Sequence, residues 1–548
     1  MEWEKALKEL VRGEVFADEE TRTKYSTDAS VFRVMPEAVV CPKDAKDVKA
    51  LVKFAATQKK KYPNFSLTAR AAGTDMGGGP LNDSVILDFT KYFNHIKEVR
   101  ATGTKGMAVV EPGVFYRDFE KAVAARGLLL PSYPASKGLC AVGGMVANNS
   151  GGEKTLAYGK TEDYVVELKV VFSDGNEYVV KPLTPSELKK KMAEKTFEGG
   201  VYKKLFTLLE KNQKMIMAAK PDVSKNSAGY YLWNVWDGTT FNLPKLIVGS
   251  QGTLGLITEI TFRLVRPKPH SLMMVIFLHD IAPVADITKE LLKFRPESLE
   301  CYDNETMKLA IRFFPSILAR VKTNPILFAL SFLPDLWMMI RYGFPKLVVM
   351  AEFTGESEDV IYARLQEVKK ALTKFNVPEH LTRHEAEEGK YWTIRRESFN
   401  LLREHVKGKN TAPVVDDVVV KPEYMAAFLP ELRAILDKYK DKLISTIAGH
   451  NGNGNFHIIP LMDFKDPSAR AILKPLMDEV YALTLRYKGS ITAEHNDGLI
   501  RTPYLKLMYG EKIVKLFEET KKIFDPLGIF NPRKKVGGDM AYALEHIK

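Results

Sequence analysis

Cysteine is scarce in this chain of 548 residues, and its three copies, Cys41, Cys140 and Cys301, lie far apart. No two of them have CxxC spacing, which excludes a zinc ribbon and a local iron–sulfur motif. A sparse and odd set of thiols fits a reducing cytosol better than a disulfide framework. We therefore expect a cytoplasmic protein.

Other targeting and binding signals are also missing. The first twenty residues are charged and helical in pattern, without the apolar segment of a signal peptide. No dense Lys/Arg tract accompanies the formal net charge of +12, so an anionic substrate or membrane surface is a better partner than nucleic acid, and we expect no nucleic-acid binding. Neither a GxGxxG nicotinamide fingerprint nor a Walker lysine is present.

The chain is too long for one ordinary core, so two or three domains are expected. The pattern predicts a helical lead-in over residues 1–35, a glycine-rich α+β region over 36–267, a second α+β region over 268–502 and a helical segment over 503–548. The clearest single elements are strands at 37–41, 85–88 and 255–264 and helices at 44–59, 284–293, 358–374, 423–440 and 503–525.

Glycine-rich loops are the first sign of a ligand. Residues 68–80 precede a strand, and their glycines let backbone N–H groups converge on an anion. Taken alone, this loop is equally well a tight turn. Three further loops at 134–152, 158–163 and 249–259 favour a ligand, because they combine glycines with small hydroxyl and amide side chains that can hydrogen-bond the edge of a flat molecule.

These segments resemble the FAD-binding domain of vanillyl-alcohol-oxidase (PCMH-type) flavoproteins, and more narrowly the D-lactate dehydrogenase, glycolate oxidase and D-2-hydroxyglutarate dehydrogenase group. The R-G-x-G-T-x-x-x-G-G, P-A-S, G-G-x-x-x-x-N-x-G-G and E-G-T-L-G-I-x-T-E motifs have counterparts here in the family's order, and the resemblance runs from about Pro36 to Lys535. It implies a PCMH-type two-subdomain FAD-binding domain, then an α+β substrate (cap) domain with a large antiparallel sheet. The 503–548 segment is expected to return to the FAD-binding domain.

By that resemblance the loop at 68–80 cradles the FAD pyrophosphate, the loop at 134–152 lines the flavin and holds its ring and ribityl chain, and the loop at 249–259 contacts the adenine side. The implied cofactor-binding residues are Ala72, Gly73, Thr74, Asp75, Gly77, Pro134, Ala135, Ser136, Gly144, Asn148, Ser150, Gly151, Gly255 and Ile257. Arg70-Ala71 replaces the usual Arg-Gly, and Ser250-Gln251 stands where Glu is frequent. The histidine that bonds flavin covalently in some relatives is missing, so we expect noncovalent FAD.

Histidine and carboxylate side chains gather in two irregular stretches. His450 and His457 lie in the glycine-rich segment 448–457, and Glu494 and His495 lie in 490–498. Two imidazoles and one carboxylate suit a divalent ion such as Zn²⁺, Mn²⁺ or Fe²⁺. From the residues alone, loop histidines satisfied by backbone hydrogen bonds are an equally open interpretation.

The relatives carry H-x-G-D-G-N-x-H and G/A-E-H-G at these places. The resemblance thus implies His450, His457 and Glu494 as metal ligands, with Zn or Mn the expected metal, and His495 as the catalytic base. Asn453 stands where the family usually has Asp, which removes a charge near the ligands but no ligand.

A substrate carboxylate needs a cation. Arg395 completes a W-x-x-R pattern seen in the family and is our choice for a bidentate clamp, with Arg396 as its rival. Asp416 and Asp417 resemble part of a family strand and are expected to be structural.

Together these features predict FAD-dependent oxidation of a small D-2-hydroxy acid, such as D-lactate, glycolate or D-2-hydroxyglutarate, to the 2-oxo acid. Hydride passes to the flavin and electrons pass on to oxygen, a quinone, a cytochrome or a partner flavoprotein, since the chain has no iron–sulfur cysteines and no nicotinamide fingerprint of its own. Two alternatives remain: a non-redox flavoenzyme of the ether-lipid synthase type, and a non-catalytic flavoprotein subunit of an oxidase complex. A homodimer is left open.

Residues 312–350 form an apolar insert that is flanked by cations. Its apolar run, 325–333, is too short to span a bilayer, which takes about 20 residues. The composition suits a helix lying in the membrane interface, and would place the protein peripherally on the inner face of the membrane. A buried helix of the cap or a subunit interface is the alternative.

Overall fold

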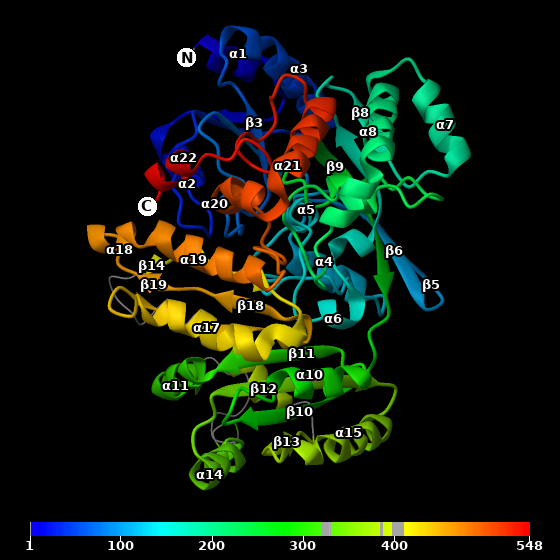
Figure 1. Cartoon of the computed structure of the whole chain (residues 1–548). Helices are drawn as coiled ribbons and strands as arrows, with labels where there is room; N and C mark the ends of the chain where they lie inside the picture. The colour runs from blue at the N-terminus through cyan, green and yellow to red at the C-terminus, as the bar shows by residue number, and fades with distance from the viewer. Residues whose placement is uncertain (1, 319–327, 329, 384–386, 397–409) are drawn as a thin grey trace.

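Two separate sheets carry the glycine-rich half of the chain (Figure 1). The computed structural model describes residues 2–318, 328, 330–383, 387–396 and 410–548. The first sheet has the order β1-β2-β4-β3, in which β2, β4 and β3 are parallel and β1 is antiparallel. Its strands are β1 (Glu14–Phe16), β2 (Ala38–Cys41), β3 (Leu67–Arg70) and β4 (Val85–Asp88). Helix α3 (Ala45–Lys61) makes the crossover from β2 to β3, as parallel strands require.

The second sheet is antiparallel, with the order β5-β6-β9-β7-β8. Its strands are β5 (Ile96–Thr102), β6 (Lys105–Val110), β7 (Val165–Val171), β8 (Glu177–Val180) and β9 (Leu256–Val265). The helices in and beside this half are α1 (Glu2–Leu10), α2 (Glu19–Tyr25), α4 (Tyr116–Ala124), α5 (Val142–Asn148), α6 (Thr155–Tyr158), α7 (Pro185–Ala193), α8 (Phe197–Ala219) and α9 (Pro244–Ile247).

A seven-stranded antiparallel sheet forms the second half, with the order β13-β10-β12-β11-β17-β18-β15. The strands are β10 (His270–Leu278), β11 (Ser298–Asp303), β12 (Leu347–Gly355), β13 (Glu379–Leu381), β15 (Val418–Val419), β17 (Ile447–His450) and β18 (Asn455–Ile458). Both faces are covered, so its central strands read as continuous apolar runs rather than alternating ones. Three short strands, β14 (Asn410–Thr411), β16 (Leu443–Ile444) and β19 (Leu461–Met462), make a small further sheet.

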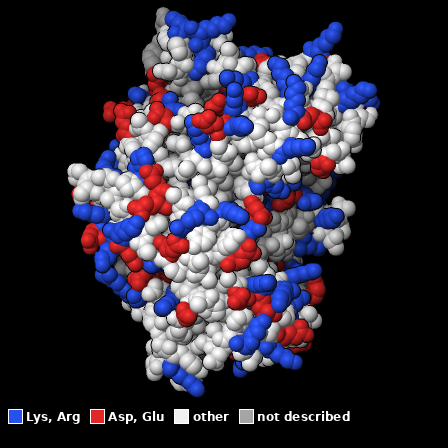
Figure 2. Space-filling view, viewed as in Figure 1, with Lys and Arg blue, Asp and Glu red and all other residues white. Residues whose placement is uncertain are grey.

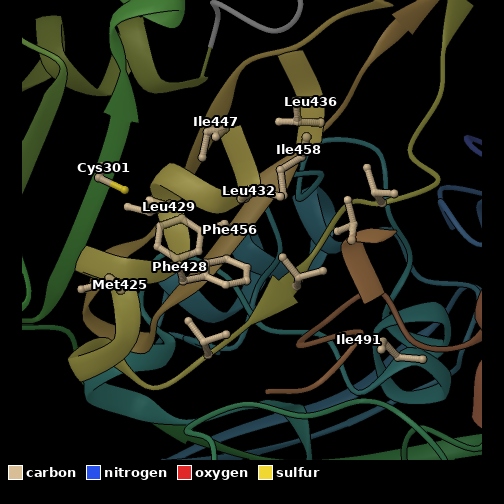
Figure 3. Close-up of a cluster of buried hydrophobic side chains, with 14 of the residues drawn as sticks. Cys301, Met425, Phe428, Leu429, Leu432, Leu436, Ile447, Phe456, Ile458 and Ile491 are labelled. Carbon is tan, nitrogen blue, oxygen red and sulfur yellow. The ribbon is translucent and has the colours of Figure 1, made fainter. Parts of the chain in front are cut away.

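Helices cover one face of the seven-stranded sheet. These are α10 (Val284–Lys293), α15 (Glu358–Leu372), α17 (Met425–Asp437) and α19 (Leu473–Arg486). Figure 3 shows how α17 does this: its apolar side chains, Phe428 and Leu432 among them, pack against Ile447, Phe456 and Ile458 of the hairpin β17–β18. The opposite face of the same hairpin is therefore left for other side chains.

The predicted elements are confirmed with shifts of a few residues at their ends. The helix at 284–293 coincides with α10, and the strand at 85–88 coincides with β4. One difference lies in the expected helical lead-in, where residues 14–16 form β1 and join the first sheet beside β2. Three residues are too few for a period to show in the sequence, and only the pairing with β2 makes them a strand.

The C-terminal segment returns to the glycine-rich half (Figure 1). It contains α21 (Leu505–Phe524) and α22 (Met540–Glu545), and α21 packs beside α8. The short helix α20 (Gly498–Arg501) precedes this segment, and α18 (Pro467–Ala471) lies beside α19 in the cap. Leu67 of β3 forms a parallel bridge with Phe530, and the Asn531 amide donates to the carbonyls of Gly79 and Gln251 at 3.0 Å and 2.6 Å. The chain end therefore fixes two of the glycine loops.

The apolar insert forms α12 (Phe314–Leu318) and α14 (Leu333–Tyr342) after α11 (Asn304–Arg312), and its last residues, 347–350, belong to β12 of the cap sheet. Residues 319–327 and 329, which include part of the predicted apolar run, lie outside the described residues. Among the helices that the structure describes, none combines the length and apolar character needed to cross a bilayer.

Candidate active site

The period of two in the cap strands sends a set of polar side chains to one face of the sheet. Leu299 and Cys301 of β11 and Phe456 and Ile458 of β18 join the core beneath α17. Their neighbours in the strands, Glu300 and His457, must then point to the opposite face. His450, at the end of β17, lies beside His457 with ring centroids 5.1 Å apart.

A tight hairpin brings the two histidines together. The turn Asn451–Asn453 joins β17 to β18, and Gly454 follows it with φ +65°. A Cβ atom on Gly454 would lie 2.0 Å from the carbonyl oxygen of Val420. Glycine is required here because the backbone is left-handed and also touches a neighbouring strand end. The hairpin therefore returns His457 to the side of His450 on one face of the sheet.

Glu494 completes a three-residue group with these histidines. Ligand atoms of His450, His457 and Glu494 all lie within 4.8 Å of one another, and Glu494 Oε1 is 3.4 Å from His450 Nε2. The three predicted metal ligands thus converge, and the mixed nitrogen and oxygen donor set fits a divalent transition metal. Burial lowers the pKa of His450, but the carboxylates of Glu300 and Glu494 outweigh burial and raise it.

The segment that carries Glu494 and His495 is held by one buried carboxylate. Asp417 Oδ2 accepts hydrogen bonds from the backbone N–H groups of Ala493, Glu494 and His495 at 2.9, 2.7 and 2.7 Å. It also accepts from Thr492 Oγ1 at 2.7 Å. These bonds fix the backbone of the segment independently of its side chains.

Asp416 lies between two imidazoles. Its Oδ2 is 2.8 Å from His495 Nδ1, and its Oδ1 is 3.2 Å from His457 Nδ1. The rings of His457 and His495 are stacked with centroids 5.1 Å apart. Burial lowers the pKa of His495, but the carboxylates of Asp417 and Asp416 outweigh burial and raise it to about 9. A carboxylate beside Nδ1 orients the ring and leaves Nε2 as its second ligand or proton-accepting atom.

Asp416, His457 and His495 also form a group whose ligand atoms lie within 4.8 Å, as do Asp417, Glu494 and His495. The expectation that Asp416 and Asp417 are merely structural is therefore incomplete. Both lie inside the cluster, because the bend after residue 415 turns two consecutive carboxylates toward it, with Asp417 at φ +71°.

Two further charged residues of the cluster were not singled out from the sequence. Glu300 Oε1 lies 2.6 Å from His450 Nδ1, and this hydrogen bond orients the ring. Lys225, whose side chain is 0% exposed, pairs with Glu494 Oε1. Burial raises the pKa of Glu494, but Lys225 and His450 outweigh burial and hold it well below its ordinary value. Glu300 could have been noticed as a charged residue within the short strand 298–303, which is buried throughout. The sequence around Lys225 has no comparable feature.

The two candidate arginines have different partners. Arg395 Nε lies 3.3 Å from Glu300 Oε2, so this side chain borders the histidine cluster. Arg396 donates to both oxygens of Glu153, at 3.2 and 2.6 Å, and stacks on Trp392 at 4.5 Å. Arg396 is thus already engaged, which favours Arg395 over its rival as the cation near the cluster.

The first glycine loop follows β3 and offers unused donors. Within the described residues, no backbone N–H from Ala72 to Met76 donates to another protein group. Asp75 Oδ1 folds the loop by accepting from the N–H groups of Gly77 and Gly79 at 2.7 and 2.9 Å. Successive free N–H groups in a turn are suited to a phosphate. The residues present therefore fit the FAD pyrophosphate.

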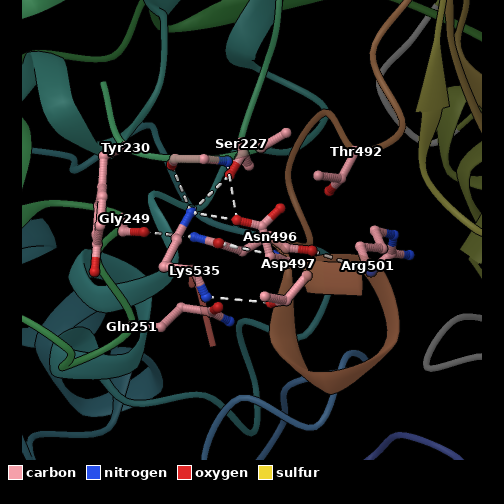
Figure 4. A network of polar contacts seen from close by, with 12 residues as sticks. Ser227, Tyr230, Gly249, Gln251, Thr492, Asn496, Asp497, Arg501 and Lys535 are labelled. Carbon is pink, nitrogen blue, oxygen red and sulfur yellow. Dashed lines mark hydrogen bonds and ion pairs between the residues drawn. The ribbon is translucent and has the colours of Figure 1, made fainter. Parts of the chain in front are cut away.

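The cap segment 496–501 contacts both the first and the last glycine loop, and Figure 4 shows Asn496 bonded to Gly249 of the last loop. Asn496 donates to the Gly249 carbonyl at 2.9 Å, and the N–H of Gly498 donates to Gln251 Oε1 at 3.0 Å. The N–H of Leu499 donates to the Gly77 carbonyl at 2.7 Å. Gln251, which replaces the frequent Glu of the family, therefore ties the last glycine loop to the segment that carries Glu494 and His495.

The remaining predicted cofactor residues meet around the same place. A Cβ on Gly144 would lie 3.5 Å from Ala71, and a Cβ on Gly151 would lie 3.2 Å from Glu494 Oε1. Asn148 donates to the Glu494 carbonyl at 3.3 Å. Pro134 packs on Gly152, where a Cβ would lie 3.3 Å from its Cα. Ala135 and Ser136 follow Pro134 in the chain, and Ser150 precedes Gly151; their predicted contacts with the flavin stay predictions.

Gly255 and Ile257 have a different setting. Gly255 immediately precedes β9, and Ile257, the second residue of that strand, pairs with Val170 of β7. A Cβ on Gly255 would lie 2.6 Å from Val170 Cγ1, so close packing of β7 against β9 by itself accounts for this glycine. Their predicted contact with the adenine side stays a prediction.

Two protein-family models match this chain. An FAD binding domain model matches residues 36–181, and a model of the C-terminal domain of FAD linked oxidases matches residues 267–535. Together they cover both halves of the fold and every residue of the histidine and carboxylate cluster except Lys225.

Similar curated proteins point the same way. The chain is 28% identical over 95% of its length to a D-2-hydroxyglutarate dehydrogenase of Pseudomonas putida. It is 26% identical over 94% of its length to the glycolate oxidase subunit GlcD of Bacillus subtilis, of which it covers 93%. It is 25% identical to a D-lactate dehydrogenase of Anaerostipes hadrus, with 96% of each chain covered. The chain spans about half the length, 50%, of the P. putida relative.

Solved structures show the fold. p-Cresol methylhydroxylase with substrate bound superposes with a TM-score of 0.66 at 16% identity, covering 98% of this chain and 96% of that one. An alkyldihydroxyacetonephosphate synthase superposes with a TM-score of 0.65 at 17% identity, covering 95% and 83%. The fold is thus the PCMH-type α+β fold, and it does not by itself separate a dehydrogenase from a synthase. On the two domain matches, the chain belongs to the FAD-linked oxidases, and it is similar to D-2-hydroxyglutarate dehydrogenase, glycolate oxidase and D-lactate dehydrogenase.

Proposed function

We propose that this protein oxidises a small D-2-hydroxy acid to the 2-oxo acid with noncovalent FAD, a divalent metal and His495 as the base. The observation that supports this most is the convergence of His450, His457, Glu494 and His495 on one side of the cap sheet, beside the glycine loops. A substrate held there would meet a base, a cation and the flavin site at once.

Side chains of the chain itself would take separate roles in the reaction. Asp416 lies beside Nδ1 of His495, so that Nε2 would take the proton of the substrate hydroxyl. The pKa of about 9 that the aspartates give His495 favours its protonated form at neutral pH, and a divalent ion held at the neighbouring His457 would lower that pKa and free the base. Glu300 orients His450 through Nδ1 of that ring. Arg395, at the edge of the cluster, binds the substrate carboxylate. The buried setting keeps water from competing for these contacts.

Two bound groups would supply the remaining chemistry. The N–H groups of the loop Ala72–Gly77 would hold the FAD pyrophosphate, and the segments around Pro134 and Gly144–Gly151 would border the flavin. FAD accepts hydride, and a divalent ion held by His450, His457 and Glu494 makes the substrate hydroxyl a stronger acid. Zn²⁺ or Mn²⁺ suits this donor set.

The test of the function is an anaerobic reduction of the purified yellow protein. D-lactate, glycolate and D-2-hydroxyglutarate are added separately, and we expect at least one of them to bleach the flavin band near neutral pH, whereas the L enantiomers of the chiral acids do not. Acid precipitation should leave the yellow colour in the supernatant, since no covalent bond to FAD is expected. A yellow pellet would contradict noncovalent binding, and a flavin that no D-2-hydroxy acid reduces would contradict the activity.

Metal removal is the next prediction. Elemental analysis should find about one divalent transition metal per chain, as a single three-residue donor set implies. Treatment with a chelator should abolish most of the flavin reduction by substrate, and adding Zn²⁺ or Mn²⁺ should restore it, while the flavin spectrum stays unchanged. Flavin reduction at the normal rate by metal-free protein would show that the ion has no part in the reaction.

Electrons must leave the reduced flavin for an external acceptor, and we propose a membrane quinone reached through α14. Its outward face is an apolar stripe, with Leu336, Trp337 and Ile340 exposed by 50%, 57% and 77%. On its inner side, the buried Asp335 accepts from Lys390 Nζ and Tyr391 Oη at 2.5 and 2.6 Å, which holds the helix on the cap. In Figure 2 the lower end of the molecule, where α14 lies in Figure 1, is largely white with Lys and Arg beside it. An apolar stripe beside cations suits the surface of an anionic bilayer.

Liposome flotation tests the role of α14. We expect the protein to float with vesicles that contain anionic lipid, and the triple change L336S/W337S/I340S to remove most of the bound fraction, because the apolar contact is lost while the charge stays the same. Leu507→Ser, which alters a 56% exposed leucine on α21, is the matched control and should float normally. Equal flotation of the triple variant would mean that the overall charge of +12, rather than α14, explains binding.

A further inference from the structure

A cation of the protein itself lies on one of the proposed metal ligands. Lys225 Nζ pairs with Glu494 Oε1, and the same oxygen is 3.4 Å from His450 Nε2. The lysine side chain is 0% exposed and that of Glu494 is 6% exposed. Among the described residues, no lysine or arginine other than Lys225 forms an ion pair with His450, His457 or Glu494.

Lys225 comes from the other half of the molecule. It lies in the connection between α8 and the short helix at residues 232–234, whereas the three ligands belong to the cap. Ser224, its neighbour, donates to the Asn453 carbonyl at 2.9 Å and accepts from Asn453 Nδ2 at 3.1 Å. The backbone at Lys225 is therefore fixed on the histidine hairpin by contacts that do not involve the lysine side chain.

We propose that Lys225 is a resident counter-cation of the metal centre, which neutralises Glu494 in the metal-free protein and opposes a divalent ion when one binds. This inference rests on the metal role in the proposed function. It assigns Lys225 a positioning and tuning role rather than contact with the substrate.

The physical reason lies in the burial of the pair. A buried carboxylate without a partner strongly destabilises a fold, so Glu494 needs a cation before any metal arrives. An ammonium and a divalent ion on the same carboxylate repel each other, and salt screens this repulsion weakly in the interior. Lys225 should therefore stabilise the metal-free fold at the expense of metal affinity.

The test compares metal affinity and stability in Lys225→Met and Lys225→Gln. Methionine has a similar length but no charge, and glutamine keeps a hydrogen-bond donor without the charge. For both we expect a lower melting temperature of the metal-free protein and a Kd for Zn²⁺ or Mn²⁺ that is about tenfold lower or more, measured by competition with a chelator. Lys521→Met is the matched control, because Lys521 is a buried lysine paired with Asp525 at 2.5 Å outside the cluster; it should lose stability without any gain in affinity.

The outcomes separate this inference from the proposed function. Tighter metal binding by the variants than by the unaltered protein supports the role of Lys225. Metal binding by the variants alone, with none by the unaltered protein, also supports that role, but it would refute the metal role in catalysis. If the unaltered protein binds metal and both folded variants bind it equally or more weakly, Lys225 is only a structural partner of Glu494 and the inference fails alone. If none of the proteins binds metal, both proposals fail.

Discussion

His495→Ala is expected to give a folded, yellow, metal-containing protein whose flavin is reduced by substrate about 10²–10⁴ times more slowly, the usual loss when a general base is removed. The backbone of this segment is held by Asp417 through the N–H groups of residues 493–495, so the loss of the imidazole should leave Glu494 in place. Stopped-flow reduction under anaerobic conditions measures the rate, and the flavin spectrum and metal content show that the site is otherwise intact.

A matched control for this variant is His380→Ala. His380 is also partly buried and also contacts a carboxylate, with Nε2 2.6 Å from Glu387 Oε1, but it lies on the edge strand β13. It should reduce its flavin at nearly the normal rate. If His495→Ala does the same at neutral pH, His495 is not the base and another group must take the hydroxyl proton.

Asp416→Asn should have the second largest effect, with flavin reduction slowed by about 10²-fold or more, by analogy with the carboxylate that orients the histidine of a catalytic triad. Asp416 is wholly buried and has His495 Nδ1 at 2.8 Å on one oxygen and His457 Nδ1 at 3.2 Å on the other. The amide of asparagine presents an N–H group to one of these rings, which favours the wrong tautomer or turns the ring. The substitution also removes the negative charge that stabilises a protonated His495.

Because Asp416 contacts both the proposed base and a proposed metal ligand, its loss should also weaken metal binding through His457, which a folding defect elsewhere in the chain would not do. Asp335→Asn is the control, since Asp335 is an equally buried carboxylate that holds Lys390 and Tyr391 under α14. It should lower stability but leave the metal affinity and the rate of flavin reduction nearly unchanged. A normal rate in Asp416→Asn would mean that Asp417 and the surrounding packing suffice to orient His495.

The glycine loops and the histidine motifs could be recognised in the sequence because their chemistry is local. A turn that presents free N–H groups needs glycines at fixed offsets, so the loops 72–77 and 144–151 stand out as candidate ligand loops, while their assignment to FAD came from the family resemblance. The pair His450 and His457 is also local, since a hairpin of fixed length returns the chain beside itself. The cap strands could likewise be predicted as buried from their continuous apolar runs.

The cluster around these motifs depends on contacts between distant parts of the chain. Glu300 meets His450 across 150 residues, and Lys225 meets Glu494 across 269. Nothing in the sequence near Lys225 distinguishes it from the many surface lysines, and its burial follows only from the docking of the α8 connection onto the cap. The two aspartates could be read as strand residues, and their role emerges only because the left-handed backbone at Asp417 turns them toward the catalytic segment.

The sequence by itself therefore determined the family, the two-part α+β architecture and the residue types of the site, because those follow from turn geometry, strand period and motifs within short stretches. Tertiary structure alone decided which charges neutralise one another: Asp416 with two imidazoles, Glu300 with His450 and Arg395, and Lys225 with Glu494. The reason is that a buried charge is stable only beside an opposite one, and the partner can come from any part of the chain that folding brings within a few ångströms.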